Sequence, residues 1–99
     1  MAQFDVYKNK NRSTKTLYPY LLDIQSNLLS DLQTTVVIPL AVKNKYSGEK
    51  LKTLHPIFEI MGKQYLSITT LLAGIERSNL GEKMSSLSES RDEIISVLD

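Results

Sequence analysis

The clearest strand signal in this chain is the stretch Tyr20-Leu21-Leu22-Asp23-Ile24-Gln25, in which Tyr20, Leu22 and Ile24 recur at every second residue on one face. The stretch Gln3-Phe4-Asp5-Val6-Tyr7 alternates with the same period and predicts another strand. Between the two, residues 8–15 carry no apolar side chain, so this segment cannot pack into a core. The first part of the chain therefore predicts two strands joined by an exposed polar loop.

A third strand is expected at Thr34-Thr35-Val36-Val37-Ile38-Pro39, which is β-branched almost throughout. Its proline lacks an N–H and must lie at an edge, at a bulge or at the end, so we expect the strand to end near Leu40. Residues 41–53 are polar and rich in lysine, with a turn signal at Ser47-Gly48. They predict a second exposed loop.

A hairpin is expected next, where Pro56–Ile60 and Gln64–Thr69 flank the turn Met61-Gly62-Lys63. Four apolar side chains would then face one core: Phe58, Ile60, Leu66 and Ile68. Residues 71–75 form either a further short strand or a continuation of the hairpin, with Gly74 marking a bend.

The last segment changes to a helical period. Ser90-Arg91-Asp92-Glu93 has the spacing of a capping box, and apolar residues recur at helical spacing from Leu87 to Leu98. Short strands, polar loops and one terminal helix predict a mainly β protein with one C-terminal α-helix, built as a small, strongly bent sheet or barrel. With 99 residues, the chain is expected to be one domain, 1–99.

Charge is distributed unevenly, although the net charge is only +1. Residues 1–52 carry eight basic and four acidic side chains, and the remainder carries four basic and seven acidic ones. The excess of lysine and arginine lies in the two polar loops, where it either steers an acidic partner or is simply solvated.

The sequence excludes several classes of protein. It contains no cysteine, so disulfides, thiolate metal sites and cysteine nucleophiles are absent. The apolar runs are too short to span a bilayer, and the first residues do not resemble a signal peptide, so we expect a cytoplasmic protein without membrane contact. The single histidine, His55, has no clustered carboxylates beside it. A small binding protein without catalytic residues, metal or cofactor is therefore expected, with RNA contact as an alternative.

Stretches spread over nearly the whole chain, read in order, resemble the CcdB family of toxins: Gln3-Phe4-Asp5-Val6-Tyr7, Asp23-Ile24-Gln25-Ser26-Asn27-Leu28-Leu29, Val37-Ile38-Pro39-Leu40, Leu54-His55-Pro56-Ile57 and Thr69-Thr70. The second and third stretches, in this order and at this spacing, are the most specific. The resemblance implies a homodimer of SH3-like barrels that each end in a helix, in agreement with the pattern of strands and helix.

The resemblance also implies a function that needs no chemistry. CcdB-type toxins poison DNA gyrase by binding its A subunit and trapping the cleaved DNA complex. A partly disordered CcdA-type antitoxin neutralises the toxin, and the pair together binds operator DNA and represses its own promoter. Poisoning of this kind works by differential binding, because the toxin shifts the gyrase population toward the cleaved state.

The resemblance assigns roles to particular residues of this sequence. The gyrase-binding surface is expected at Ser26, Asn27, Leu28, Leu29 and Asp99. The dimer interface is expected at Phe4, Leu28, Leu29 and Leu98, so Leu28 and Leu29 fit either role. An acidic antitoxin segment that folds on binding is expected at the two basic loops, on Lys8, Lys10, Arg12, Lys15, Lys43 and Lys45.

Two departures from the family pattern leave alternatives open. The family's tail continues past the position of Asp99 to an aromatic-glycine-isoleucine sequence that is not present here, so a folded toxin that binds antitoxin without poisoning gyrase is one alternative. The family's Val-Pro pair after Thr-Thr is replaced by Ile75-Glu76. A MazF-type mRNA endoribonuclease shares the same barrel and also dimerises. RNA cleavage, however, needs a general base and clustered arginines, and the three arginines here are scattered.

Overall fold

The computed structural model describes residues 3–25, 32–43 and 55–98. In this part of the chain the elements are β1 (Asp5–Asn9), β2 (Tyr20–Asp23), β3 (Thr34–Val42), β4 (Ile57–Ile60), β5 (Lys63–Ser67), β6 (Ala73–Glu76), β7 (Leu80–Ser86) and α1 (Arg91–Leu98). Short 3-10 helices follow β5, β6 and β7, at Thr69–Leu71, Arg77–Asn79 and Ser88–Ser90. The strands form one antiparallel sheet in the order β4-β5-β3-β2-β1-β7, and β6 pairs with β3 off this path.

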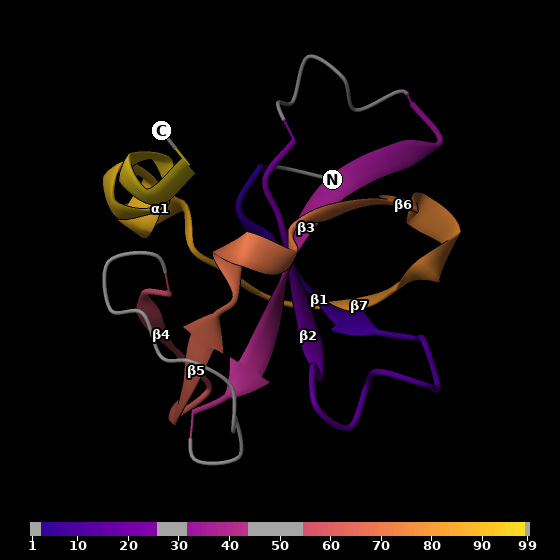
Figure 1. The fold of residues 1–99 in the computed structure, drawn as a ribbon, viewed down its shortest axis with the longest axis horizontal. Coiled ribbons are helices and arrows are strands. Elements are labelled where there is room, and N and C mark those ends of the chain that lie inside the picture. The colour runs from indigo at the N-terminus through magenta and orange to yellow at the C-terminus, as the bar shows by residue number, and fades with distance from the viewer. Residues whose placement is uncertain (1–2, 26–31, 44–54, 99) are drawn as a thin grey trace.

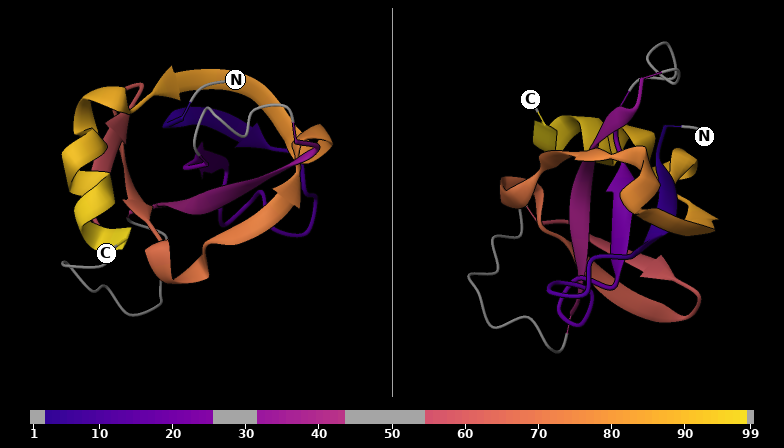
Figure 2. Two further views of the ribbon diagram at one scale, coloured as in Figure 1. Left: turned by 90° about the horizontal axis from the view of Figure 1, so that it is seen from above. Right: turned by 90° about the vertical axis from the view of Figure 1, so that its right-hand side faces the viewer.

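The sheet curls into a half-barrel with α1 along one side (Figures 1 and 2). Strand β3, nine residues long, pairs with β2 along one edge and with β6 and then β5 along the other. The chain passes from β6 through a 3-10 turn into β7, which pairs with β1. The expected fold class is confirmed: the protein is mainly β, with one C-terminal α-helix on a small SH3-like barrel.

The main core lies inside the curl and takes alternate residues from neighbouring strands. The predicted face of β2 is confirmed, because Leu22 is fully buried and Tyr20 and Ile24 pack against the same cluster. The buried members of this cluster are Phe4, Val6, Leu22, Ile38, Leu40, Phe58, Ile60, Tyr65, Leu87 and Ile94. Their removal from water is the main favourable contribution to folding.

Strand β3 runs through Pro39 and ends at Val42, two residues beyond the Leu40 position near which its end was expected. In an antiparallel strand, the N–H and C=O of one residue face the same neighbour. The Pro39 carbonyl accepts a hydrogen bond from the Ile68 N–H at 3.0 Å, so the position of its missing N–H faces away from β2. On that side β3 pairs with β6 as far as Val37, and with β5 from Leu40 onward. Pro39 therefore lies where β3 changes its partner from β6 to β5, and no neighbouring strand requires a hydrogen bond from an N–H at this position.

The predicted hairpin is present as β4 and β5, but its turn is shorter than expected. Ile60 pairs with Lys63, so the turn contains two residues, Met61 and Gly62. Their φ angles are 52° and 84°, and a two-residue hairpin turn of type I′ requires positive φ at both positions.

The shorter turn shifts the register of β5 against β4 by one residue. Because side chains alternate between the two faces of a strand, this shift moves every side chain of β5 to the opposite face. Tyr65 lies opposite Phe58 and joins the main core. The expectation that Leu66 and Ile68 would face the same core is wrong, since they pack with Ala41 in a second cluster.

Strand β7 is missing from the sequence prediction because its side chains are half-buried or exposed throughout and show no apolar face. Its register with β1 contains shifts on both sides of Tyr7. A Cβ atom at Gly81 would lie 2.9 Å from the Lys8 Cβ, so a glycine is needed for the two strands to approach. For residues 71–75 the structure contains the separate strand β6 rather than a continuation of the hairpin.

The terminal helix begins where the sequence predicts. Helix α1 starts at Arg91, directly after Ser90, and has two acidic residues in its first turn, where the helix dipole favours them. Ile94 is 1% exposed in the main core. Leu87 belongs to the same core but precedes the helix.

Candidate functional site

Residues from both predicted basic loops lie at one end of the sheet: the loop between β1 and β2, and Lys43 from the second loop. Strands β1 and β3 both run antiparallel to β2, so their last residues, Asn9 and Val42, lie at the same end (Figure 1). We call this the basic end and define it by Lys8, Lys10, Arg12, Lys15 and Lys43. Lys45, which was predicted with them, lies outside the described residues.

The loop between β1 and β2 is organised by the buried side chain of Asn9. Its Nδ2 donates to the Thr14 Oγ1 and to the Tyr18 carbonyl, both at 2.9 Å. Its Oδ1 accepts from the Asn11 N–H at 2.9 Å, and its own N–H donates to the Pro19 carbonyl at 3.0 Å. A loop held in this way presents its cations on a preformed surface, which lowers the entropic cost of binding.

An open cavity of about 370 Å³ lies at the basic end and is lined by Lys8, Lys15 and Tyr20 among others. The Lys8 Nζ is 3.6 Å from a Glu82 carboxylate oxygen, an exposed pair that neutralises little. The rings of Tyr20 and Tyr65 meet edge to face at 5.2 Å. Burial, and then the nearby Tyr20, raises the pKa of the Tyr65 hydroxyl above its ordinary value. This hydroxyl therefore adds no negative charge to the basic end at neutral pH.

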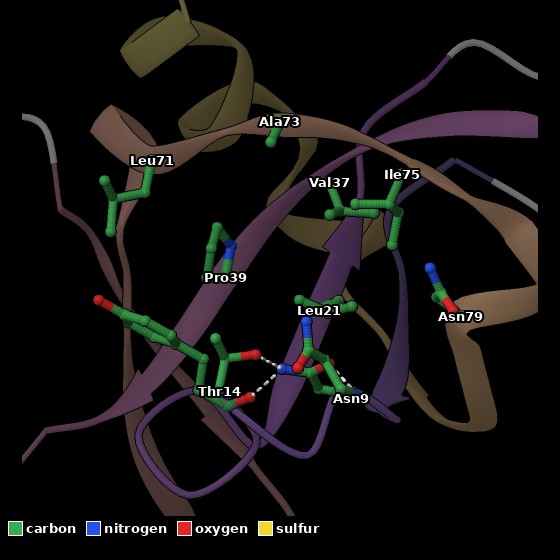
Figure 3. A pocket seen from close by; sticks show the side chains of 11 residues that line it. Asn9, Thr14, Leu21, Val37, Pro39, Leu71, Ala73, Ile75 and Asn79 are labelled. Carbon is green, nitrogen blue, oxygen red and sulfur yellow. Dashed lines mark hydrogen bonds between the residues drawn. The ribbon is translucent and has the colours of Figure 1, made fainter.

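A second cavity, of about 270 Å³, lies between the β1–β2 loop, strands β2 and β3, and β6 (Figure 3). Its apolar wall consists of Leu21, Val37, Pro39, Leu71, Ala73 and Ile75, and its polar wall of Asn9, Asn11, Thr14, Tyr18 and Asn79. Leu71 is 46% exposed, and its neighbour Leu72 is 44% exposed. Apolar side chains that stay this accessible are typical of contact surfaces.

At the other end of β2, a buried aspartate joins several chain segments. Asp23 is 3% exposed, and its Oδ1 accepts hydrogen bonds from the Thr35 Oγ1 at 2.8 Å and the Gln25 N–H at 3.0 Å. Its Oδ2 lies 3.8 Å from the Arg77 Nη1. Neither Thr35 nor Arg77 was predicted from the sequence as a partner of this aspartate. The sequence signal that could have indicated such partners is the acidic residue within an apolar strand, because a buried carboxylate requires hydrogen-bond or charge partners.

All five residues assigned to gyrase binding lie outside the described part of the chain. These are Ser26, Asn27, Leu28, Leu29 and Asp99. The segment that contains the first four is flanked by described residues on both sides, Gln25 and Leu32. Leu98, assigned to the dimer interface, is the last residue of α1.

Phe4, also assigned to the dimer interface, lies inside the protomer. It is 2% exposed in the main core and has a φ of 70°. Its N–H donates to the Asp23 carbonyl at 2.6 Å, and its carbonyl accepts from the Leu87 N–H at 2.7 Å. The Arg91 guanidinium carbon is 6.0 Å from the centre of its ring. Phe4 can therefore support an interface from within but offers little surface of its own.

The surroundings of His55 are those of a buried side chain with a structural role. It is 4% exposed, and its Nε2 lies 3.2 Å from the Thr70 Oγ1. Among residues 3–25, 32–43 and 55–98, no group of three or more His, Cys, Asp or Glu side chains could hold a metal ion. In the same residues, no helix is long and apolar enough to cross a membrane.

Solved structures of other proteins share this fold, among them two endoribonucleases. One is an endoribonuclease from mycobacterial species, with a TM-score of 0.68 and 14% sequence identity, over 99% of this chain and 86% of that chain. The other is an endoribonuclease from mycobacterial species in complex with its cognate antitoxin, with a TM-score of 0.68, 14% identity, and coverage of 99% and 90%. The small curled sheet closed by a helix is therefore a fold that this chain has in common with these endoribonucleases.

The sequence itself defines the family more narrowly. The model of the CcdB protein family matches residues 3–99. This chain belongs to the CcdB family, and the resemblance drawn from its short stretches is confirmed.

Proposed function

We propose that this protein is the toxin of a toxin–antitoxin pair, and that it binds the A subunit of DNA gyrase and traps the cleaved DNA complex. The observation that carries the proposal is the CcdB family match over residues 3–99. The gyrase-binding surface is formed by Ser26, Asn27, Leu28, Leu29 and Asp99. Binding that favours the cleaved state shifts gyrase toward it without any chemical step by the toxin.

The active toxin is a cytoplasmic homodimer. Its interface includes Leu28, Leu29 and Leu98, with Phe4 supporting the contact from the core of each protomer. The exposed apolar side chains of this small barrel, such as Leu71 and Leu72, support association with a second macromolecule.

A CcdA-type antitoxin binds the basic end, and the complex represses its own promoter by binding operator DNA. The support is geometric: the hydrogen-bonded loop between β1 and β2 lies at the same end of the sheet as Lys43, which is far from it in the sequence. An acidic segment would be drawn there by charge. A structurally similar endoribonuclease has been solved in complex with its cognate antitoxin, which is consistent with an antitoxin partner for this chain.

The experiment is a DNA-cleavage assay with purified gyrase, supercoiled plasmid and the folded protein. We expect cleaved plasmid to accumulate, and Leu28→Asp to abolish it because a charge would enter an apolar contact. Leu17→Asp is the matched control, since Leu17 is 40% exposed on the β1–β2 loop, and it should leave trapping unchanged. No trapping by the wild-type protein would contradict the proposal.

The second candidate function is cleavage of mRNA, favoured by the similarity in fold to two endoribonucleases. Incubating the protein with a mixed RNA substrate tests it directly. Specific RNA cleavage without gyrase trapping would replace the gyrase proposal. Antitoxin binding without either activity would identify a folded protein that only binds antitoxin.

A further inference from the structure

The cavity of about 270 Å³ that Leu71 borders, which we call the Leu71 cavity, has no charged side chain in its wall. Six of its eleven lining residues are apolar. Several of the polar ones already use their side chains inside the β1–β2 loop. The Asn9 Nδ2 donates to the Thr14 Oγ1 and to the Tyr18 carbonyl, both at 2.9 Å, and the Asn11 Oδ1 accepts from a backbone N–H two residues on, also at 2.9 Å. The wall therefore offers an occupant apolar contact more than hydrogen bonds.

The size of the Leu71 cavity suits one large side chain. Cavities that hold drug-sized ligands have volumes of about 300–1,000 Å³, so this cavity lies below that range. Leu71 is 46% exposed, and an apolar side chain that entered here would remove some of this surface from water. The walls come from β2, β3, β6 and the hydrogen-bonded loop (Figure 3), so the cavity does not have to form when a partner binds.

Basic side chains surround the Leu71 cavity without lining it. Each of the four cations at the end of β1 and on the following loop is next in the sequence to a lining residue: Lys8, Lys10, Arg12 and Lys15. The Lys10 Nζ donates to the Ser78 carbonyl at 3.2 Å, directly before the lining residue Asn79. Asn9 lines both this cavity and the one that contains Lys8 and Lys15, so the two cavities adjoin.

The surroundings of the Leu71 cavity stay positive when the nearby acids are counted. Glu82 has a carboxylate oxygen 3.6 Å from the Lys8 Nζ, and both side chains are more than half exposed. Glu76 has a carboxylate oxygen 3.5 Å from the Ser78 Oγ. Two acids against four cations leave an excess of positive charge, which favours an acidic partner.

We propose that the Leu71 cavity and the cations around it form one docking surface for a peptide segment, which places an apolar side chain in the cavity and acidic side chains on the surrounding lysines. The inference rests on the proposed function, because it makes this segment part of the antitoxin. A nucleic acid would meet the same cations, but its bases would find a mostly apolar wall with one aromatic ring, that of Tyr18, for stacking. The wall therefore favours the peptide.

The probe is a short synthetic peptide in which one leucine is flanked by aspartates and glutamates, titrated into the ¹⁵N-labelled protein. We expect the amide shift changes to concentrate at Leu71, Ala73, Ile75 and the β1–β2 loop. Replacing the leucine of the peptide by serine should raise the Kd about tenfold, because apolar burial is lost. This comparison leaves the protein itself unchanged. Added salt should weaken both peptides, since the lysines attract the acids of each.

A variant of the protein tests the same contact from the other side. Leu71→Asp should raise the Kd of the leucine peptide about tenfold or more, and Leu71→Asn should lose most of the same affinity without adding a charge. Leu32→Asp is the matched control. Leu32 is 48% exposed but does not line the cavity, and it precedes β3 at the end of the sheet opposite Val42. Its substitution should change the Kd less than about twofold.

Three results would overturn the inference. They are equal affinities for the leucine and serine peptides, binding of a mixed-sequence single-stranded RNA at the cavity in place of the peptide, and loss of self-association in Leu71→Asp alone, which would show that a second copy of the chain covers the cavity. The gyrase cleavage assay, run in parallel, separates this inference from the proposed function. If the peptide docks but gyrase is not trapped, the docking surface stands and the gyrase proposal fails. If gyrase is trapped and the peptide does not dock, this inference alone fails.

Discussion

The Ile94→Ala substitution tests whether burial of one side chain holds α1 against the barrel. The helix has eight residues, and isolated helices shorter than about 12 residues are marginal in water. Ile94 is 1% exposed and packs in the main core with Phe4 and Leu87. Packing at this position must therefore supply much of the free energy that keeps α1 helical.

The magnitude follows from the degree of burial. Truncating a buried isoleucine to alanine costs about 2–5 kcal/mol, because transfer free energy is lost and a cavity remains. At about 3 kcal/mol, and with about 4–8 °C of Tm per kcal/mol in a domain of this size, the Tm should fall by roughly 12–24 °C. Ile57 is 42% exposed on β4, and Ile57→Ala, which deletes the same atoms, should cost under about 1 kcal/mol.

Both variants are to be melted by far-UV circular dichroism and calorimetry at several protein concentrations, since the Tm of the proposed dimer would depend on concentration. The difference between the two Tm shifts should persist at every concentration. Equal shifts, or a larger shift for Ile57→Ala, would refute the packing of α1 against the core.

Three further predictions concern other parts of the molecule. Gly81→Ala should destabilise the protein by about 1–3 kcal/mol in urea unfolding, because the new Cβ would lie 2.9 Å from the Lys8 Cβ and 3.0 Å from the Lys8 carbonyl oxygen; an unchanged midpoint would argue against this close approach. Because burial raises the pKa of Tyr65 in the folded state, the unfolded chain loses its proton first as pH rises, so stability should fall above about pH 10. Tyr65→Phe should reduce that slope, and equal slopes would contradict the shift. Reversing the charge at Lys10 and Arg12 should slow antitoxin association, most strongly at low ionic strength, in stopped-flow measurements; rates that do not change with salt would contradict steering by the basic end.

Local signals in the sequence predict most of the barrel. The alternation at residues 20–25 identifies the core face of β2 correctly, because one face of that strand is buried. The hairpin is predicted, but its register is not, since a two-residue turn at Met61-Gly62 and a three-residue turn share the same glycine signal. Strand β7 leaves no such signal, because it is stabilised by pairing with β1 and not by an apolar face.

The candidate site was predictable only where it depends on composition. The lysine-rich segments are visible in the sequence, but the placement of the first segment and Lys43 at one end depends on the pairing of β1, β2 and β3. The Asp23–Arg77 pair joins residues that are far apart in the sequence, and no local pattern links them. Pro39 suggested a strand end for a sound local reason, and only the change of partner from β6 to β5 accommodates it.

The most direct test of the central claim is a calorimetric titration of the folded protein with purified gyrase A subunit in the absence of DNA. We expect saturable binding of the proposed toxin dimer to the A subunit. A folded, dimeric protein that shows no binding to the A subunit at any accessible concentration would contradict it.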